Sequence, residues 1–347
     1  MRARILRRLH RTSLAGLLGV GLAVAGLASA APAAETASGD RQAAGVSEAA
    51  GAVDAGDTAD AADAAQLPGP LYIDPDSQVR RWTAANPGDS RQPVIADRIA
   101  SQPQARWLSQ YNPGTVQQQV AGYMSAAGDA LPVLAVYGIP NRDCGGASSG
   151  GAPDLPSYQN WIQLIAAGLG DHPVVIILET DALALEDCLD QSGRDARHAA
   201  LRQAVTTLKS ADPQAHVYLD GGHSGWHSPA DQAARLSASG VAEADGVFTN
   251  VSNFRTTAEE LAYGKQILAA IGDPDLNLVV DTSRNGNGSN GEWCDPSGRA
   301  LGTNPTLETG DDAVDALLWV KPPGEADGCA AGAGQFVPDL AYALATN

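Results

Sequence analysis

Positive charge is scarce in this chain of 347 residues. It has 22 Lys and Arg against 40 Asp and Glu, which gives a formal net charge of −18. Binding to a phosphate backbone depends on clustered Lys and Arg. The composition therefore argues against nucleic acid as a partner, whereas a neutral polymer meets no such objection.

Signatures of metal and nucleotide binding are also missing. The four cysteines form no CxxC pair and the six histidines form no HxH pair, which are common features of zinc sites. We expect no metal and no cofactor. The alternative is a metal-dependent hydrolase or deacetylase that uses His223 and aspartates, and activity retained in EDTA would exclude it. No glycine-rich phosphate loop joins a predicted strand directly to a helix, which disfavours a nucleotide-binding sheet.

The N-terminus has the pattern of a secretory signal peptide over residues 1–30. Five arginines precede an apolar run at 14–28, and small residues end it at Ala28-Ser29-Ala30. The run is shorter than the roughly 20 residues that a membrane-spanning helix needs. We expect a secreted protein with no membrane association after cleavage. An uncleaved anchor is the alternative, and the export route, general secretory or twin-arginine, stays open.

Residues 31–68 contain no Lys and no aromatic side chain. A stretch of Ala, Gly, Asp, Thr and Ser cannot bury a core, so we expect a disordered linker. The remainder, 69–347, is long enough for one large folded domain and shows no internal repeat. We expect it to be monomeric. All four cysteines lie in this domain, where export favours disulfides, and three pairings are possible.

Short runs rich in Val, Leu and Ile alternate with amphipathic stretches in this domain. The runs, which we interpret as buried parallel strands, are 133–139, 174–179, 216–220, 246–251, 277–281 and 317–321. The stretches with helical spacing include 155–169, 194–210 and 257–271. Such βαβα alternation is typical of an α/β fold. We favour a parallel barrel over a doubly wound open sheet.

Acidic residues stand at or just after the ends of these predicted strands. They are Asp143, Asp181, Asp220, Asp281 and Asp327. Each one alone is more often a helix N-cap. The carboxyl ends of parallel barrel strands share one rim, however, and five acids there would push their pKa values apart. A carboxylic acid beside a carboxylate is the pair that glycoside cleavage needs.

Aromatic residues accompany the acids. Trp82, Tyr137, Trp226 and Trp293 lie in or beside the predicted loops, where an indole can stack on the apolar face of a sugar. The alternative is core packing, to which we assign Trp319 because it lies within a predicted strand.

Motifs along the whole of residues 69–347 resemble glycoside hydrolase family 6. The blocks that carry the resemblance are VYGIPNRDC from Val136, YLDGGHSGW from Tyr218, NVSNF from Asn250, DTSRNGNG from Asp281, WCDPSG from Trp293 and WVKPPGEADG from Trp319. The resemblance implies a distorted, incomplete TIM-like barrel with its active-site groove at the carboxyl ends of the strands. It also implies inverting hydrolysis of internal β-1,4 bonds in cellulose or a related β-glucan. A cellobiohydrolase and a non-catalytic glucan-binding relative are the alternatives.

The resemblance also assigns roles to residues. Asp181 matches the general acid, Asp143 matches the aspartate that tunes it, and Asp327 matches the base. Asp220 and Tyr137 match further catalytic positions. The positions that match substrate-binding residues are Trp82, Arg142, Ser149, His223, Trp226, Asn253, Trp293, Lys321 and Glu325. Inversion requires the acid and base carboxyls to lie about 6.5–9.5 Å apart. The family's disulfide pairing corresponds to Cys144–Cys188 and Cys294–Cys329.

Two positions depart from the family pattern. Thr180 replaces the usual proline before the acid, which puts the placement of Asp181 in question. Asp295 stands where asparagine is common, and we expect its charge to raise the pKa of neighbouring carboxyls.

The segments that enclose the glucan in exo-acting relatives are short here. Only 37 residues separate Asp143 from Asp181, and the span from Cys294 to Cys329 has no long insertion. An open cleft admits the middle of a chain, so the sequence favours an endoglucanase.

Overall fold

The computed structural model describes residues 67–347, so the predicted signal peptide and nearly all of the predicted linker lie outside the described residues. One parallel seven-stranded sheet forms the centre of this region, with the strands hydrogen-bonded in chain order. The strands are β1 (Arg106–Leu108), β2 (Val133–Val136), β3 (Val174–Leu178), β4 (Ala215–Asp220), β5 (Gly246–Thr249), β6 (Asn277–Asp281) and β7 (Val314–Leu318).

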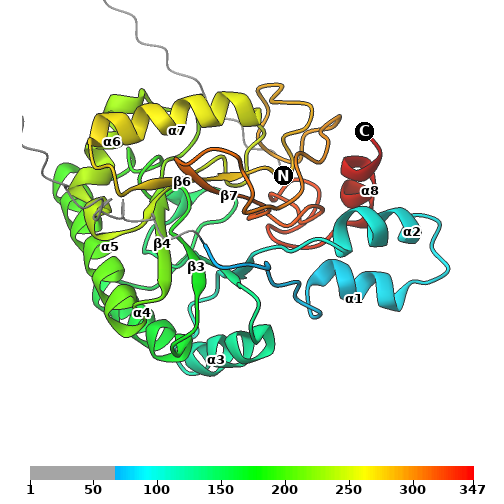
Figure 1. Ribbon diagram of the computed structural model, residues 1–347, viewed down its shortest axis with the longest axis horizontal. Helices are drawn as coiled ribbons and strands as arrows, with labels where there is room; N and C mark the ends of the chain where they lie inside the picture. The colour runs from blue at the N-terminus through cyan, green and yellow to red at the C-terminus, as the bar shows by residue number, and fades with distance from the viewer. Residues whose placement is uncertain (1–66) are drawn as a thin grey trace, which may run out of the picture. The chain divides into compact units, whose positions relative to one another are not determined.

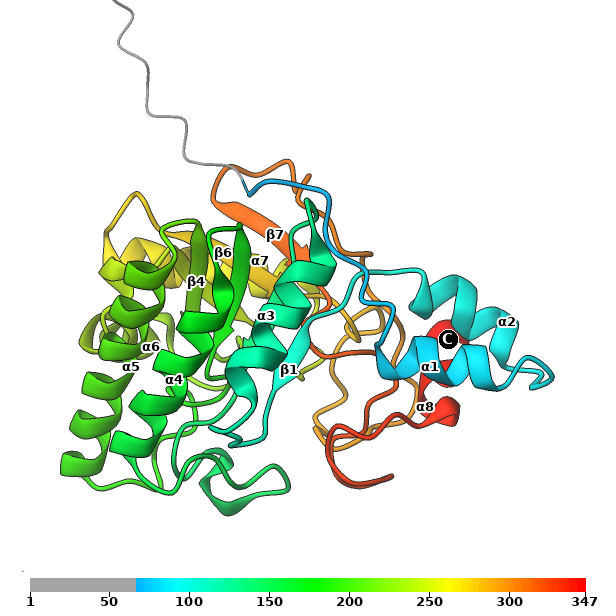
Figure 2. The same ribbon diagram turned by 90° about the horizontal axis from the view of Figure 1, so that it is seen from below.

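Helices cover the outside of this sheet (Figures 1 and 2). The connecting helices are α3 (Val116–Ala127), α4 (Leu155–Leu169), α5 (Gln191–Ala211), α6 (Pro229–Ala238) and α7 (Thr257–Ile271). A separate group at one side consists of α1 (Gln78–Ala85), α2 (Gln92–Ile95) with the π-helical turn Ala96–Ala100, and α8 (Pro338–Thr346). Short 3-10 turns lie at Asp143–Gly145 and Val241–Glu243. Within residues 67–347, no helix combines the length and apolar character of a bilayer span.

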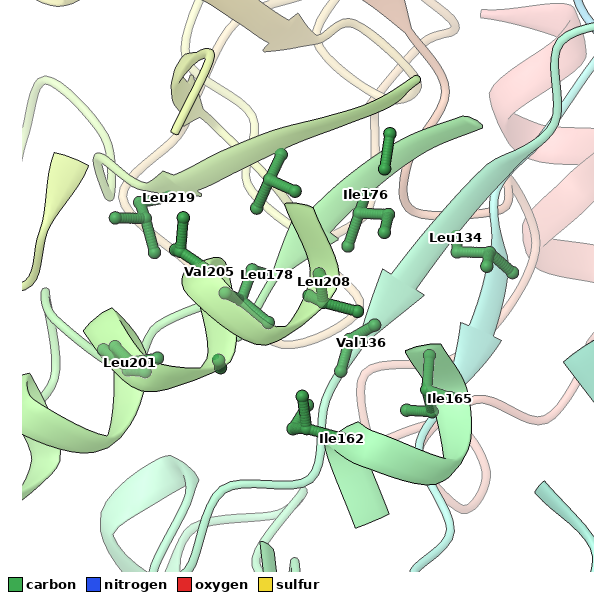
Figure 3. Close-up of a cluster of buried hydrophobic side chains, with 14 of the residues drawn as sticks. Leu134, Val136, Ile162, Ile165, Ile176, Leu178, Leu201, Val205, Leu208 and Leu219 are labelled. Carbon is green, nitrogen blue, oxygen red and sulfur yellow. The ribbon is translucent and has the colours of Figure 1, made fainter. Parts of the chain in front are cut away.

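Alternate residues of each strand pack on opposite faces of the sheet, and both faces are buried. On β3, Ile176 and Leu178 belong to the core between sheet and helices, whereas Val175 and Ile177 belong to the interior of the curled sheet. Figure 3 shows the outer core, where Ile162, Ile165, Leu201, Val205 and Leu208 of two helices meet Leu134, Val136, Ile176, Leu178 and Leu219 of the strands. Burial on both faces explains why β2 and β3 are uninterrupted apolar runs.

The barrel is incomplete, as expected from the sequence. β1 and β7 are the two ends of the strand order and do not pair as strands in the described region. Beside this gap, Ala105 N donates to Trp319 O at 3.0 Å and Trp107 Nε1 donates to Val320 O at 2.7 Å. The sheet therefore curls far enough to bury its inner face without closing its strand ladder.

Two further expectations can be compared with the fold. The last strand begins and ends three residues earlier than the run 317–321 predicted, so Trp319 follows β7. Its indole is nevertheless fully buried against the α1, α2 and α8 group, which confirms the core assignment. Leu67 is only 4% exposed and packs in the inner core, so ordered packing begins two residues before position 69.

The disulfides are Cys144–Cys188, with Cα atoms 5.8 Å apart, and Cys294–Cys329, with Cα atoms 5.9 Å apart. The pairing implied by the family resemblance is confirmed.

Candidate active site

A cavity of about 1030 Å³ opens at the carboxyl ends of the strands, and we call it the rim cavity. It brings together residues that are far apart in the chain. The predicted site residues that line it are Tyr137, Arg142, Asp143, Ser149, Asp181, His223, Trp226, Asn253, Trp293, Lys321, Glu325 and Asp327. Two predicted site residues, Trp82 and Asp220, are not among its lining residues.

The loop after β2 presents Asp143 to the rim cavity. The Asp143 carboxylate accepts a hydrogen bond from Ser148 N at 2.6 Å. Gly146 lies so close that a Cβ there would sit 2.6 Å from Asp143 Oδ2, so a larger residue would displace the Asp143 carboxyl from this position. Arg142 donates to Ser109 O at 2.6 Å and Ser148 O at 2.8 Å, and its guanidinium lies 4.4 Å from the centre of the Tyr137 ring. These contacts fix the loop at both ends.

The loop after β3 presents Asp181. Burial raises the pKa of its carboxyl well above the usual range, and the negative charges of Asp220, Asp143 and Asp327 raise it further. The Lys321 ammonium opposes this effect without cancelling it. The result is a carboxyl group that holds its proton while facing a cavity.

Asp220 lies beneath this loop at the end of β4 and is buried. Its Oδ2 accepts hydrogen bonds from Leu183 N at 3.1 Å and Ala184 N at 3.0 Å, and its Oδ1 accepts one from Gly222 N at 2.9 Å. Burial raises its pKa. Asp220 thus holds the segment that follows Asp181 and acts on it at short range, rather than facing the cavity.

Asp327 has the opposite environment. Burial alone would raise its pKa, but the charges of Arg284 and Lys321 lower it below the usual value. Arg284 Nη1 lies 2.8 Å from Oδ2 and Lys321 Nζ lies 3.3 Å from Oδ1, and all three side chains are buried. Asp327 is therefore held as a carboxylate.

We expected the charge of Asp295 to raise the pKa of neighbouring carboxyls, but the pKa of Asp327 is lowered. Asp295 N donates to Asp327 Oδ2 at 3.1 Å, and this bond helps to lower the Asp327 pKa. In return, the Asp295 carboxylate accepts hydrogen bonds from the backbone N–H groups of Asp327, Cys329 and Ala330, at 2.7, 3.0 and 2.8 Å. Asp295 therefore affects the pKa of Asp327 through its backbone N–H, which lowers it, and not through its side-chain charge as we expected.

Thr180 directly precedes Asp181, at the position where the family pattern has proline. Its Oγ1 is buried and has no hydrogen-bond partner in the described residues. The residues on either side, Glu179 and Asp181, have positive φ angles of 57° and 66°.

Left-handed backbone is concentrated around the rim. Besides glycine, the residues with positive φ are Asn141, Asp143, Cys144, Glu179, Asp181, Asn250, Ser252 and Asp295, all in loops after β2, β3, β5 and β6. Such conformations cost of order 1 kcal/mol each and persist where the surroundings over-determine them, commonly at functional sites.

The aromatic residues divide into two groups. Trp226 and Trp293 are exposed at the cavity, 38% and 59% respectively, and Trp226 stacks on His223 with ring centres 4.5 Å apart. Tyr137 is buried, with its ring edge-on to Trp107 at 5.4 Å. Trp82 packs on Phe336 at 5.8 Å, in the group of α1, α2 and α8.

The polar end of the cavity is formed by Lys321 and Glu325. Lys321 Nζ donates to Ala326 O at 3.1 Å, and Glu325 Oε1 accepts a hydrogen bond from Gln78 Nε2 at 2.6 Å. Burial raises the pKa of Glu325 to about 7. Ser149 and Asn253 line other parts of the wall.

No group of three or more His, Cys, Asp or Glu side chains in residues 67–347 has the arrangement of a metal site. His223 and His227 are four residues apart, but they are held separately. His223 Nδ1 accepts from Gly225 N at 3.0 Å, and His227 Nε2 is 2.7 Å from Ala184 O. Burial lowers the pKa of His223 to about 4, so this ring is neutral at pH 7.

Sequence reasoning missed several residues of the site. Arg284, which pairs with Asp327, lies inside a quoted motif and is its only arginine, a signal that could have been used. Trp107 and Gln78 line the cavity without a recognisable local pattern.

An α/β barrel with a protonated acid, an ionised carboxylate and exposed indoles on one rim has the architecture of a glycoside hydrolase. The model of glycosyl hydrolases family 6 matches residues 69–345. Endoglucanase A from Thermobispora bispora is 52% identical over 283 residues, covering 80% of this chain and 62% of that protein. Endoglucanase 1 from Streptomyces sp. (strain KSM-9) is 53% identical over 275 residues, covering 78% and 76%. The chain belongs to glycosyl hydrolase family 6.

A solved structure supports the fold assignment. The endoglucanase Cel6 from Mycobacterium tuberculosis, in complex with methyl-cellobiosyl-4-deoxy-4-thio-β-D-cellobioside, superposes with a TM-score of 0.75 at 44% identity. The match covers 82% of this chain and 98% of that one. The incomplete barrel predicted from the sequence is confirmed.

Proposed function

We propose that the protein is a secreted, inverting endo-β-1,4-glucanase that cleaves cellulose or a related β-glucan. The observation that carries the proposal is a pair of aspartates in one cavity with opposite titration behaviour. Asp181 has a raised pKa and Asp327 a lowered one, so one carboxyl is protonated while the other is ionised. This is the division of roles that glycoside hydrolysis needs.

In this mechanism Asp181 donates its proton to the departing glycosidic oxygen. A water molecule attacks the anomeric carbon from the opposite face of the sugar ring and gives up a proton, for which we assign Asp327 as acceptor. The acid and base must stand about 6.5–9.5 Å apart so that this water fits between sugar and carboxylate. Asp143 keeps the pKa of Asp181 high by charge repulsion and can relay a proton through water.

Arg284 and Lys321 make Asp327 a weak base because they stabilise its ionised form. That arrangement suits a carboxylate facing a sugar on which positive charge develops in the transition state. Burial raises the pKa of Tyr137, and the nearby charge of Asp143 raises it further, so Tyr137 acts as a neutral phenol.

The substrate assignment rests on the lining of the rim cavity. Trp226 and Trp293 offer exposed apolar ring faces, and Lys321 and Glu325 offer groups that can hydrogen-bond to sugar hydroxyls. Related proteins carry the name endoglucanase, and one was solved with a thio-linked cellobioside. A linear β-1,4-glucan fits this combination. Trp82 remains a predicted platform, although it lies outside the cavity lining.

Endo action follows from the short segments around the site. The segment from Asp143 to Asp181, which includes α4 and β3, and the segment from Cys294 to Cys329, which includes β7, have no long insertions that could cover the cavity. Secretion is proposed from the N-terminal pattern, and two disulfides are consistent with an oxidising compartment.

The test is the action of the purified chain on carboxymethylcellulose. An endoglucanase lowers viscosity strongly while few reducing ends form, and replacing Asp181 by Asn should cut kcat by about 10³-fold, within the usual range for general acid catalysis. Asp187→Asn on the same loop, exposed and outside the cavity lining, is the matched control. Absence of activity in the parent chain would overturn the proposal.

A further inference from the structure

One buried side chain joins the two loops that carry Asp143 and Asp181. Arg197 projects from α5 and is only 2% exposed. Its Nη1 donates to Ala182 O at 3.0 Å, in the loop after β3. Its Nη2 donates to Pro140 O at 3.0 Å and Asn141 O at 3.2 Å, in the loop after β2.

These contacts fall very close to both aspartates. Ala182 directly follows Asp181, and Asn141 precedes Asp143 by two residues. The guanidinium therefore links the two loops one residue from Asp181 and two residues from Asp143. Arg197 is absent from the lining of the rim cavity, so it does not contact a bound sugar.

The bridge does not come from an ion pair. Within residues 67–347 no carboxylate oxygen lies within 4.0 Å of the Arg197 guanidinium. Its donors point instead at backbone carbonyls. A buried charge costs several kcal/mol unless it is compensated. The three carbonyls accept hydrogen bonds from Arg197, and the charges of Glu179, Glu186 and Asp220 favour its charged form from farther away.

The loops need such a constraint because their backbone is strained. Asn141, Asp143 and Asp181 all have positive φ angles, between 55° and 66°. Left-handed conformations of this kind persist only where the surroundings leave no relaxed alternative. Arginine is suited to this task, since its planar fork donates in two directions at once, which a lysine ammonium on a flexible stem does not reproduce.

A second connection between the same loops lies farther out. The Cys144–Cys188 disulfide joins the residue after Asp143 to a position seven residues beyond Asp181. It keeps the loops attached to each other when Arg197 is changed, without fixing the backbone beside the acid.

We propose that Arg197 is a positioning residue that sets the separation and orientation of the Asp143 and Asp181 carboxyl groups. This rests on the proposed function, in which these two groups handle the proton for the leaving oxygen. It assigns a role in the reaction to a residue on the far side of the loops from the substrate.

The test is Arg197→Lys, which keeps the buried charge and removes the fork. We expect kcat on a soluble cello-oligosaccharide to fall about 10- to 100-fold, the usual cost of misplacing catalytic groups by about 1 Å. KM should stay within about twofold, since the sugar-binding wall is untouched. The basic limb of the kcat/KM profile should move to lower pH, because a more distant Asp143 raises the pKa of Asp181 less.

Arg202→Lys is the matched control, since Arg202 is exposed on the same helix and its guanidinium donates to Ala238 O. It should leave kcat, KM and the pH profile unchanged. Thermal unfolding of each variant establishes that it folds. If Arg197→Lys does not fold, Arg197→Gln takes its place, because the amide still offers two N–H donors without the charge.

A folded Arg197 variant with the kcat and basic limb of the parent overturns the positioning role. So does a variant that loses thermal stability alone. If the parent chain itself fails to cleave cello-oligosaccharides, the proposed function is wrong, and this outcome is distinct from a failure of the Arg197 proposal.

Discussion

Asp181 and Asp327 are the same residue type on the same rim, and their surroundings give them opposite chemistry. Asp181 is half-buried at the cavity, and desolvation together with the charges of Asp220 and Asp143 raises its pKa, so its neutral form is favoured. Asp327 is buried between Arg284 and Lys321, so its charged form is favoured. Burial is common to both, and the sign of the nearest charges decides the outcome.

This account predicts the effect of Asp143→Asn on the pH profile. Asp181 must be protonated to act as the acid, so activity is lost as pH rises through the Asp181 pKa. Asp143 raises that pKa by repulsion, and removing its charge lowers it. The basic limb of kcat/KM should therefore shift to lower pH.

The measurement is kcat/KM for a soluble cello-oligosaccharide across pH. Asparagine tolerates the positive φ of 56° at position 143, so backbone strain does not confound the comparison. Asp187→Asn should leave the limb in place. A limb that stays fixed or moves to higher pH in Asp143→Asn would contradict the role given to its charge.

At the residue scale, the sequence predicted those site residues whose position in the chain alone indicates where they lie. Asp143, Asp181 and Asp327 follow strands, and that position alone predicted a shared rim. Arg197 could not be predicted in the same way, because it acts through backbone carbonyls 15 to 57 positions away. Arg284 stands inside a motif, but its partner Asp327 is 43 positions away. The effect of Asp295 on Asp327 was also out of reach, since it depends on a hydrogen bond from the Asp295 backbone N–H to a carboxylate 32 positions away.

Among the elements, two of the three predicted helices matched their predicted bounds, whereas α5 begins three residues earlier and ends one residue later than the predicted stretch 194–210. α4 and α7 begin and end at the residues that the sequence predicted. Asp154 caps α4 by accepting a hydrogen bond from Ser157 N at 2.8 Å. A capping box of Thr256 and Glu259 begins α7, and Gly272 in left-handed conformation ends it.

Elements without such signals were missed. β1 has only three residues, too few for a recognisable run, and its identity as a strand depends on pairing with β2. The helices α1, α2 and α8 are short and pack against one another around Trp319. Their stability is tertiary, so no local pattern reveals them.

The capping box of α7 yields a stability prediction. Thr256→Ala removes the hydroxyl that accepts from Glu259 N and should lower the free energy of unfolding by about 1 kcal/mol. Denaturant unfolding measures this change. Thr207→Ala, within α5 and outside any cap, is the control and should have a smaller effect. Equal losses in the two variants would contradict the importance of the cap.

At the scale of the whole described region, the sheet order explains how the site forms. Seven parallel strands paired in chain order bring every carboxyl end to one rim. The loops that carry Asp143 and Asp327 therefore meet at that rim although they are far apart in the chain. The gap between β1 and β7 was predicted only through the family resemblance, because composition and periodicity do not determine whether a parallel sheet closes.

Direct observation of the first product tests the central claim that rim aspartates carry out inverting hydrolysis. Proton NMR of a cello-oligosaccharide, recorded during the first minutes of cleavage, distinguishes the two anomers before they equilibrate. In the proposed mechanism water attacks the anomeric carbon directly, on the face opposite the departing oxygen, which predicts that the new reducing end appears first as the α-anomer. A β-anomer as the first product would contradict it.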